Sequence, residues 1–188
     1  MGLSFHPTSV ALAVDVSTDT TISGNLTTRQ RFTADNITLT VTGFVEKTGN
    51  RTIQVNSKTG STVIVESGAT VSATTFQAIY IQGTTGATIT NSGVIKVVGD
   101  SSSRGAISGN SAGTSNSTIT NSGKIFVTGT GQAIQLGASS TVTNSGSIRS
   151  FAKDYAEAIK WLKLAAEQKF EAAQFKLELM HLNQNILN

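Results

Sequence analysis

Few side chains in this sequence could catalyse a reaction. The chain has no cysteine, and its two histidines, His6 and His181, lie near opposite ends, so we expect no thiol nucleophile and no histidine cluster. Glycoside cleavage needs two carboxylates about 5–10 Å apart. The repetitive part of the chain contains only Glu46, Glu66 and Asp100, and no two of these occupy matching places in the repeat. We therefore expect no enzyme, no catalytic residue, no metal site and no cofactor.

One short motif recurs along the chain. Residues 88–93 and 118–123 both read Thr-Ile-Thr-Asn-Ser-Gly, residues 141–146 differ by one Val, and weaker copies stand at 38–43 and 63–68. The glycines of the five copies are Gly43, Gly68, Gly93, Gly123 and Gly146, at intervals of 25, 25, 30 and 23 residues. A second register places Ile53, Ile79, Ile107 and Ile134 at intervals of 26, 28 and 27 residues. Two interleaved registers with one period predict a solenoid of stacked coils.

The motif has the chemistry of a parallel β-helix. Glycine suits the tight corners, and side chains alternate between inside and outside along each strand. We expect one core column of Ile64, Ile89, Ile119 and Val142, and another of Ile95, Ile125 and Ile148. Asn91, Asn121 and Asn144 would form a hydrogen-bonded ladder at one corner, next to Gly93, Gly123 and Gly146, with Glu66 at the same corner of an earlier coil. An antiparallel sandwich would not keep one motif at one period, so the sequence favours the β-helix.

The same residues resemble a known family. The run Thr-Asn-Ser-Gly-x-Ile, followed further along by Ala-Ile, is similar to the repeats of autotransporter passenger domains over residues 60–150, and more loosely over 36–60. That resemblance implies a right-handed β-helix of a bacterial surface or secreted protein, often an adhesin. The fold class expected is therefore all-β, a right-handed parallel β-helix of about five to six coils over residues 36–150.

Threonines recur on the outward positions of the motif strands. The pairs are Thr38 and Thr40, Thr88 and Thr90, Thr118 and Thr120, and Thr141 and Thr143. In a β-helix they would form two columns, with about 4.8 Å between coils and about 6.6 Å across the strand. This array is one candidate binding face and resembles the ice-binding face of some antifreeze solenoids. Threonine also has a high strand propensity, and residues 63–65, Val-Ile-Val, interrupt the expected columns, which favours a plain exposed strand.

The two ends of the chain differ from the repeats. Residues 1–35 are less regular and predict an N-terminal cap or an irregular first coil. From residue 151 the composition shifts to Ala, Glu, Lys, Leu and Gln, which predicts an α-helical segment over 151–188. The run Asp-Tyr-Ala-Glu-Ala-Ile-Lys-Trp-Leu-Lys-Leu-Ala-Ala-Glu-Gln at 154–168 resembles the first helix of a Sel1-like repeat, a resemblance that extends over 151–183. Candidate docking residues on this segment are Trp161, Leu162, Phe170 and Leu177. A cap, a partner-docking helix and a fused segment all remain open.

Composition narrows the function further. Charged residues make up 13% of the chain and the net charge is +3 without a dense basic run, which argues against nucleic-acid binding. No stretch approaches the roughly 20 apolar residues of a membrane span. No signal-peptide pattern follows Met1, so either a leader has been removed or export does not use that route. The triplets at Asn25, Asn36 and Asn116 fit the N-glycosylation pattern but are expected by chance in such a composition.

These observations predict a cell-surface or secreted β-solenoid with a structural or adhesive role. Its expected partner is a ligand on a host or neighbouring cell, either a glycan or a protein, and self-association is a further expectation. The alternatives are the ice-binding solenoid and, less favoured, a polysaccharide-degrading β-helix enzyme.

Overall fold

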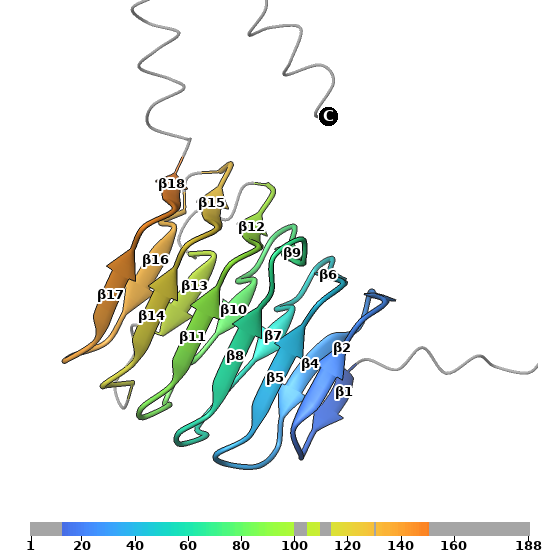
Figure 1. The fold of residues 1–188 in the computed structure, drawn as a ribbon, viewed down its shortest axis with the longest axis vertical. Coiled ribbons are helices and arrows are strands. Elements are labelled where there is room, and N and C mark those ends of the chain that lie inside the picture. The colour runs from blue at the N-terminus through green and yellow to red at the C-terminus, as the bar shows by residue number, and fades with distance from the viewer. Residues whose placement is uncertain (1–12, 100–104, 110–113, 130, 151–188) are drawn as a thin grey trace, which may run out of the picture.

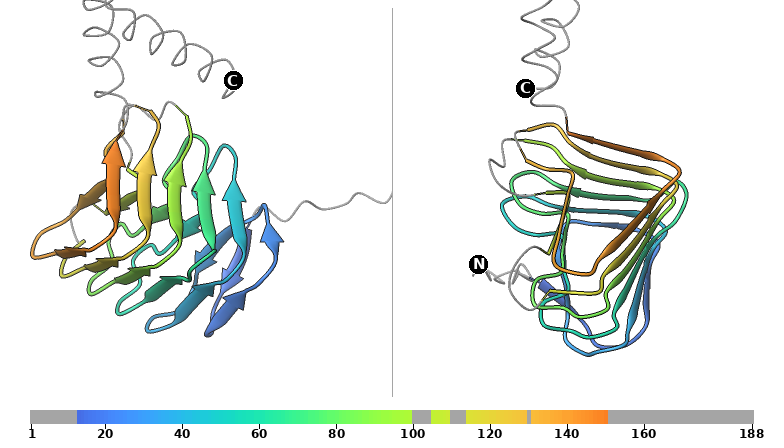
Figure 2. Two further views of the ribbon diagram at one scale, coloured as in Figure 1. Left: turned by 45° about the horizontal axis from the view of Figure 1, so that its top comes forward. Right: turned by 90° about the vertical axis from the view of Figure 1, so that its left-hand side faces the viewer.

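The described part of the chain is a stack of coils built from parallel strands (Figure 1). The computed structural model describes residues 13–99, 105–109, 114–129 and 131–150. Each coil contributes one strand to each of three sheets, and every pairing between coils is parallel. Figure 2 shows the coils stacked one above the next around a common interior. The prediction of a parallel β-helix is thus confirmed, while its handedness stays a prediction.

Within the described residues, each sheet has six strands. Sheet A consists of β1 (Ala13–Val16), β4 (Arg29–Phe32), β7 (Ile53–Gln54), β10 (Ile79–Tyr80), β13 (Ile107–Gly109) and β16 (Ile134–Leu136). Sheet B consists of β2 (Thr20–Ile22), β5 (Thr38–Val41), β8 (Thr62–Val65), β11 (Thr88–Asn91), β14 (Thr118–Asn121) and β17 (Thr141–Asn144). Sheet C consists of β3 (Asn25–Leu26), β6 (Phe44–Lys47), β9 (Thr70–Ala73), β12 (Val94–Val97), β15 (Lys124–Val127) and β18 (Ser147–Ser150).

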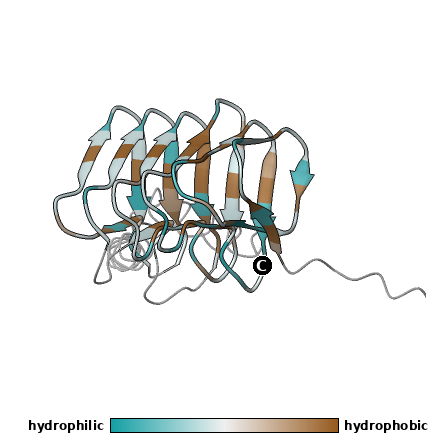
Figure 3. Ribbon diagram, turned by 90° about the horizontal axis from the view of Figure 1, so that it is seen from below, coloured by the Kyte–Doolittle hydropathy of each residue, from teal (hydrophilic) through white to brown (hydrophobic). Residues whose placement is uncertain are grey.

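The core consists of columns of aliphatic side chains, one column for each inward position. Along the strands hydrophobic residues alternate with hydrophilic ones (Figure 3), because successive side chains point to opposite faces. In sheet B the column is Leu39, Val63, Ile89 and Ile119; in sheet C it is Val45, Val71, Ile95 and Ile125; in sheet A it is Ile53, Ile79 and Ile107. All of these are at most 1% exposed. Each such buried side chain stabilises the fold by about 1.5–3 kcal/mol.

The core column expected through Ile64 was wrong by one residue. Val63 pairs with Ile89 and is buried, whereas Ile64 pairs with Thr90 and points outward. The cause is the turn after β8, which has four residues, 66–69, where the coils on either side have two. Counting four residues back from Gly68, as from Gly93 to Ile89, therefore selects Ile64 in place of Val63. The residue that pairs with Asn91 is Val65, and not Glu66 as expected.

The ends of the chain are described in part. Residues 13–26 form β1, β2 and β3, which pair with the strands of the following coil. The expected helical segment, 151–188, lies outside the described residues, so the division into three regions stays a prediction. Within the described ranges there is no helix that could span a membrane.

The corner between sheets A and B repeats a left-handed backbone conformation. The residues that hold it are Asn36, Gly60, Gly86, Asn116 and Ser139, with φ between 52° and 71°. The backbone N–H of each of the first four residues donates a hydrogen bond of 2.9–3.1 Å to the next coil. The five residues therefore form one column that ends at Ser139. Asparagine and glycine tolerate this conformation better than other residues. Two of the glycosylation-like triplets thus have a structural explanation: an Asn at this corner is followed two residues later by an outward Thr of sheet B.

The glycine corner between sheets B and C gives a test of the stacking. A Cβ on Gly123 would meet the Gly93 carbonyl oxygen, and would lie 2.7 Å from Ser92 C and 2.9 Å from Gly93 N. We expect Gly123→Ala to lower the free energy of unfolding by about 1–3 kcal/mol, because the coils would have to separate. Gly24 occupies the same corner of the first coil, has no positive φ, and has no atom within 4 Å of such a Cβ. Gly24→Ala is therefore the matched control, and equal losses in denaturant unfolding of the two variants would contradict this account.

Candidate functional site

The predicted asparagine residues lie in one column at the corner between sheets B and C. Asn91 pairs with Asn121, which pairs with Asn144. The amide Nδ2 of Asn91 donates to Asn121 Oδ1 at 2.6 Å, and Asn121 Nδ2 donates to Asn144 Oδ1 at 2.7 Å. Asn91 and Asn121 are at most 1% exposed, and Asn144 in the last described coil is exposed. The ladder therefore satisfies buried amides by linking one coil to the next.

The ladder ends within the solenoid. In the earlier coils the same position is held by Ile22, Val41 and Val65. Asn91 Oδ1 is buried, and it has no hydrogen-bond partner among the described residues. The adjoining glycines Gly93, Gly123 and Gly146 stack so closely that a Cβ on the second or third would meet the carbonyl oxygen of the one before. These residues hold the coils together.

The predicted threonine face lies on the outside of sheet B, and one of its columns is more regular than expected. Thr38, Thr62, Thr88, Thr118 and Thr141 follow one another in register over five coils. The neighbouring column runs Thr21, Thr40, Ile64, Thr90, Thr120 and Thr143, so one isoleucine interrupts it. Thr118, Thr120, Thr141 and Thr143 are exposed, and Thr88 and Thr90 are half-buried. The one-residue shift in β8 explains why the sequence count missed Thr62.

Sheet A carries an outward column of a different kind, which the sequence analysis did not single out. It runs through all six coils as Asp15, Arg31, Gln54, Tyr80, Ser108 and Gln135. The last four each follow an isoleucine of the second register directly in sequence. Reading the residue after each of these isoleucines would have found them. The column combines one aromatic ring with planar amide and guanidinium groups.

The centre of this column has polar groups that the described protein does not satisfy. The Arg51 guanidinium lies over the Tyr80 ring at 3.9 Å from its centroid. Gln54 neighbours Tyr80 in register, and its Oε1 is buried without a hydrogen-bond partner among the described residues. The Nε atoms of Arg51 and Arg29 are likewise buried without a partner there. Gln54 and Tyr80 are both half-buried, so their side chains remain partly accessible. We name Arg51, Gln54 and Tyr80 the sheet A cluster.

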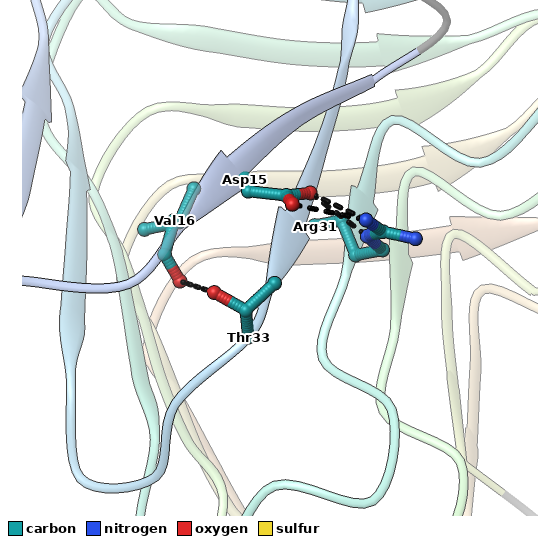
Figure 4. A network of polar contacts seen from close by, with 4 residues as sticks. All are labelled: Asp15, Val16, Arg31 and Thr33. Carbon is teal, nitrogen blue, oxygen red and sulfur yellow. Dashed lines mark hydrogen bonds and ion pairs between the residues drawn. The ribbon is translucent and has the colours of Figure 1, made fainter.

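Four of the five acids in the described residues, Asp15, Asp19, Asp35 and Glu46, take part in structural contacts. Arg31 donates to both carboxylate oxygens of Asp15, at 2.9 and 3.0 Å (Figure 4). Asp19 and Asp35 accept the backbone N–H groups of Thr38 and Thr59.

The remaining acids are separate from these. Glu46 accepts the hydroxyl of Ser72 at 3.0 Å, and Glu66 lies exposed in the four-residue turn. Asp100 lies outside the described residues. In the ranges that the structure describes, no three acidic, histidine or cysteine side chains gather as a metal site would require.

The basic residues of sheet C are spread over two columns. Lys96 and Arg149 share one column with Phe126 between them, and Lys124 belongs to the neighbouring column. The predicted docking residues Trp161, Leu162, Phe170 and Leu177 lie outside the described residues.

The fold and these surfaces can now be set beside known proteins. The family model described as the BigA third pectate lyase-like domain matches residues 7–163. This chain belongs to that family. No curated protein and no solved structure matches the chain. The family match includes β1–β3 and runs beyond β18, so the domain is wider than the repeats alone.

The buried middle of the ladder gives a pH-dependent test. In Asn121→Asp the carboxylate would no longer donate to Asn144 Oδ1 and would lie near the Gly123 carbonyl oxygen, which Asn121 Nδ2 contacts at 3.3 Å. We expect a loss of about 2 kcal/mol or more in the free energy of unfolding at neutral pH. Burial raises the folded-state pKa of the new carboxyl above about 3.9, so the loss should be absent below that pH and grow as the pH rises.

The exposed end of the same ladder provides the control for this pH dependence. Asn144→Asp keeps the acceptor for Asn121 and should change stability little at any pH. Urea unfolding of both variants between pH 3 and pH 8 measures the difference. A pH-independent loss in Asn121→Asp would contradict the buried-ladder account.

Proposed function

We propose that this chain is a non-catalytic binding domain of a bacterial cell-surface or secreted protein, built as a right-handed β-helix. The observation that carries the proposal is the sheet A cluster, where Arg51, Gln54 and Tyr80 bring unsatisfied polar atoms to a partly exposed aromatic ring. The family description and the resemblance of the repeats to passenger domains support a surface location.

The ligand class that suits the sheet A cluster is a saccharide. Sugar hydroxyls can accept from the guanidinium of the half-buried Arg51 and can bond the amide of the half-buried Gln54, whose Oε1 is buried in the free protein and would have to turn outward. The Arg51 guanidinium lies over one face of the Tyr80 ring, so a sugar would pack against the part of this half-buried side chain that Arg51 leaves accessible. The column continues to Gln135, which accepts a hydrogen bond of 3.4 Å from the buried Ser108 side chain, so Tyr80 and Gln135 are the accessible positions on either side of Ser108.

A catalytic role has less support than binding. General acid–base chemistry requires ionisable groups within hydrogen-bond reach of a shared reacting atom. On the outer face of sheet A the described acid is Asp15, and the Arg31 guanidinium holds both of its carboxylate oxygens. We therefore infer that the pectate lyase-like description of the family refers to the fold.

Binding to the sheet A cluster is testable with matched variants. Tyr80→Ala should weaken binding about tenfold, either to a glycan identified on an array or to the target cells. The substitution removes a stacking contact of about 0.5–1.5 kcal/mol and also the ring over which the Arg51 guanidinium lies. Tyr80→Phe should retain most of the binding, since the ring remains. Thr90→Ala on sheet B is the surface control. Equal affinity of the parent and of Tyr80→Ala would exclude this cluster, and loss of binding in Thr90→Ala would move the site to sheet B.

A second candidate function is ice binding by the outer face of sheet B. The observation that favours it is the unbroken column from Thr38 to Thr141, which the sequence count had not revealed. Ile64 in the neighbouring column and the uneven coil lengths argue against a lattice match.

Thermal hysteresis decides the question of ice binding. If sheet B binds ice, the parent should show hysteresis, and Thr90→Tyr with Thr120→Tyr should abolish it by disrupting the flat array. Circular dichroism of the variant would check that the coils remain folded. A parent without hysteresis rules out the ice-binding function.

A further inference from the structure

The two ends of the solenoid have different edges. At the N-terminal end the strands of sheets B and C are short, with three residues in β2 and two in β3. Acidic side chains accompany them: Asp15 is paired with Arg31, and Asp19 accepts the backbone N–H of Thr38. Short, charged edge strands discourage pairing with further strands.

The C-terminal edge differs in strand length and in charge among the described residues. Strands β17 and β18 keep the four residues of interior strands, and Arg149 in β18 is the one charged residue of 131–150. All four residues of β17 are exposed. Val142 is 43% exposed, although Val63, Ile89 and Ile119 in the same column are at most 1% exposed.

The asparagine ladder reaches this edge at Asn144. Asn91 and Asn121 each donate to the next coil, and Asn144 Nδ2 donates to the carbonyl oxygen of Gly146 at 3.3 Å, a contact of the kind that Asn121 Nδ2 also makes with Gly123. Ile134, Leu136 and Ile148, which lie in the same last coil, are only partly buried. Nothing in the described part of the chain covers this apolar surface.

We propose that the C-terminal edge, formed by β16, β17 and β18, is the docking site for residues 151–188 of the same chain. This segment starts directly after Ser150, the last residue of β18, so no other surface of the solenoid is nearer to it in sequence. Its apolar residues include Leu162, Phe170 and Leu177, whose spacings of 8 and 7 residues favour one face of a helix, and Trp161, which adjoins Leu162 in sequence. The family match extends to residue 163, so the domain does not end at the last described coil.

Covalent attachment gives this segment an advantage over other occupants of the edge. A tethered segment binds at a high effective concentration, which a second copy of the chain at micromolar concentration does not reach. A parallel β-coil from another protein could also pair with this edge and continue the ladder. It would then have to compete with residues 151–188, which follow Ser150 directly. Docking of the tethered segment covers Val142 and keeps the last coil from pairing with other sheet edges.

Trp161 is the single tryptophan of the chain and adjoins Leu162, so its fluorescence reports on the surroundings of this part of the segment. In the full chain we expect a blue-shifted emission maximum and protection from acrylamide, both independent of protein concentration. Val142→Lys should shift the emission to the red and increase quenching, because the lysine would lie under the docked segment.

Two controls accompany the Val142 variant. Val14→Lys makes the same change at the N-terminal edge, where Val14 is 42% exposed, and should leave the emission unchanged. Thr143→Lys places the charge on the outward face of the same strand and should also leave it unchanged.

The outcomes separate docking from its alternatives. Emission and quenching of the parent equal to those of free indole would overturn the proposal, as would a response to Val14→Lys as large as that to Val142→Lys. A blue shift that disappears on dilution would assign the edge to a second copy of the chain and would equally overturn it. None of these results depends on saccharide binding at the sheet A cluster, so the two proposals can fail separately.

Discussion

Hydrogen bonding between successive coils is the interaction on which the rest of this structure depends. A single coil has no interior of its own, and its aliphatic side chains become buried only when the next coil stacks on it. The parallel register fixes which residues meet, so each inward position becomes a continuous column from Leu39 to Ile119 in sheet B and from Val45 to Ile125 in sheet C. The same constraint arranges the outward side chains in columns.

Two corners allow the coils to approach this closely. Between sheets B and C, a glycine stacks on the carbonyl group of the coil before it, and the neighbouring asparagines link their amides through the stack. Between sheets A and B, residues with positive φ repeat from Asn36 to Ser139. Several polar side chains here bond the backbone or one another, which helps a motif rich in Asn, Ser and Gly to lie in a well-packed protein, although Asn91 Oδ1 is buried without a partner among the described residues.

The outer faces of the sheets differ in what they offer a ligand. Sheet B presents threonines with one interruption, a surface that suits solvent as well as a regular lattice. Sheet A presents Arg51, Gln54 and Tyr80 with polar atoms that lack protein partners. Membership of a pectate lyase-like family fits the coil architecture, whereas the chemistry of the site must be argued from these side chains.

The sequence by itself determined the repeating unit, the parallel stacking and the asparagine corner, because one motif recurred at one period and alternation assigned the faces of each strand. It could not place Val63, since a longer turn at residues 66–69 shifted β8 by one residue while the glycine spacing stayed regular. It also missed the sheet A column, because Gln54, Tyr80 and Ser108 share no residue type and become neighbours only through stacking. Tertiary structure decided these points, because register depends on the number of residues in each turn and on the hydrogen bonds that the coils make with each other.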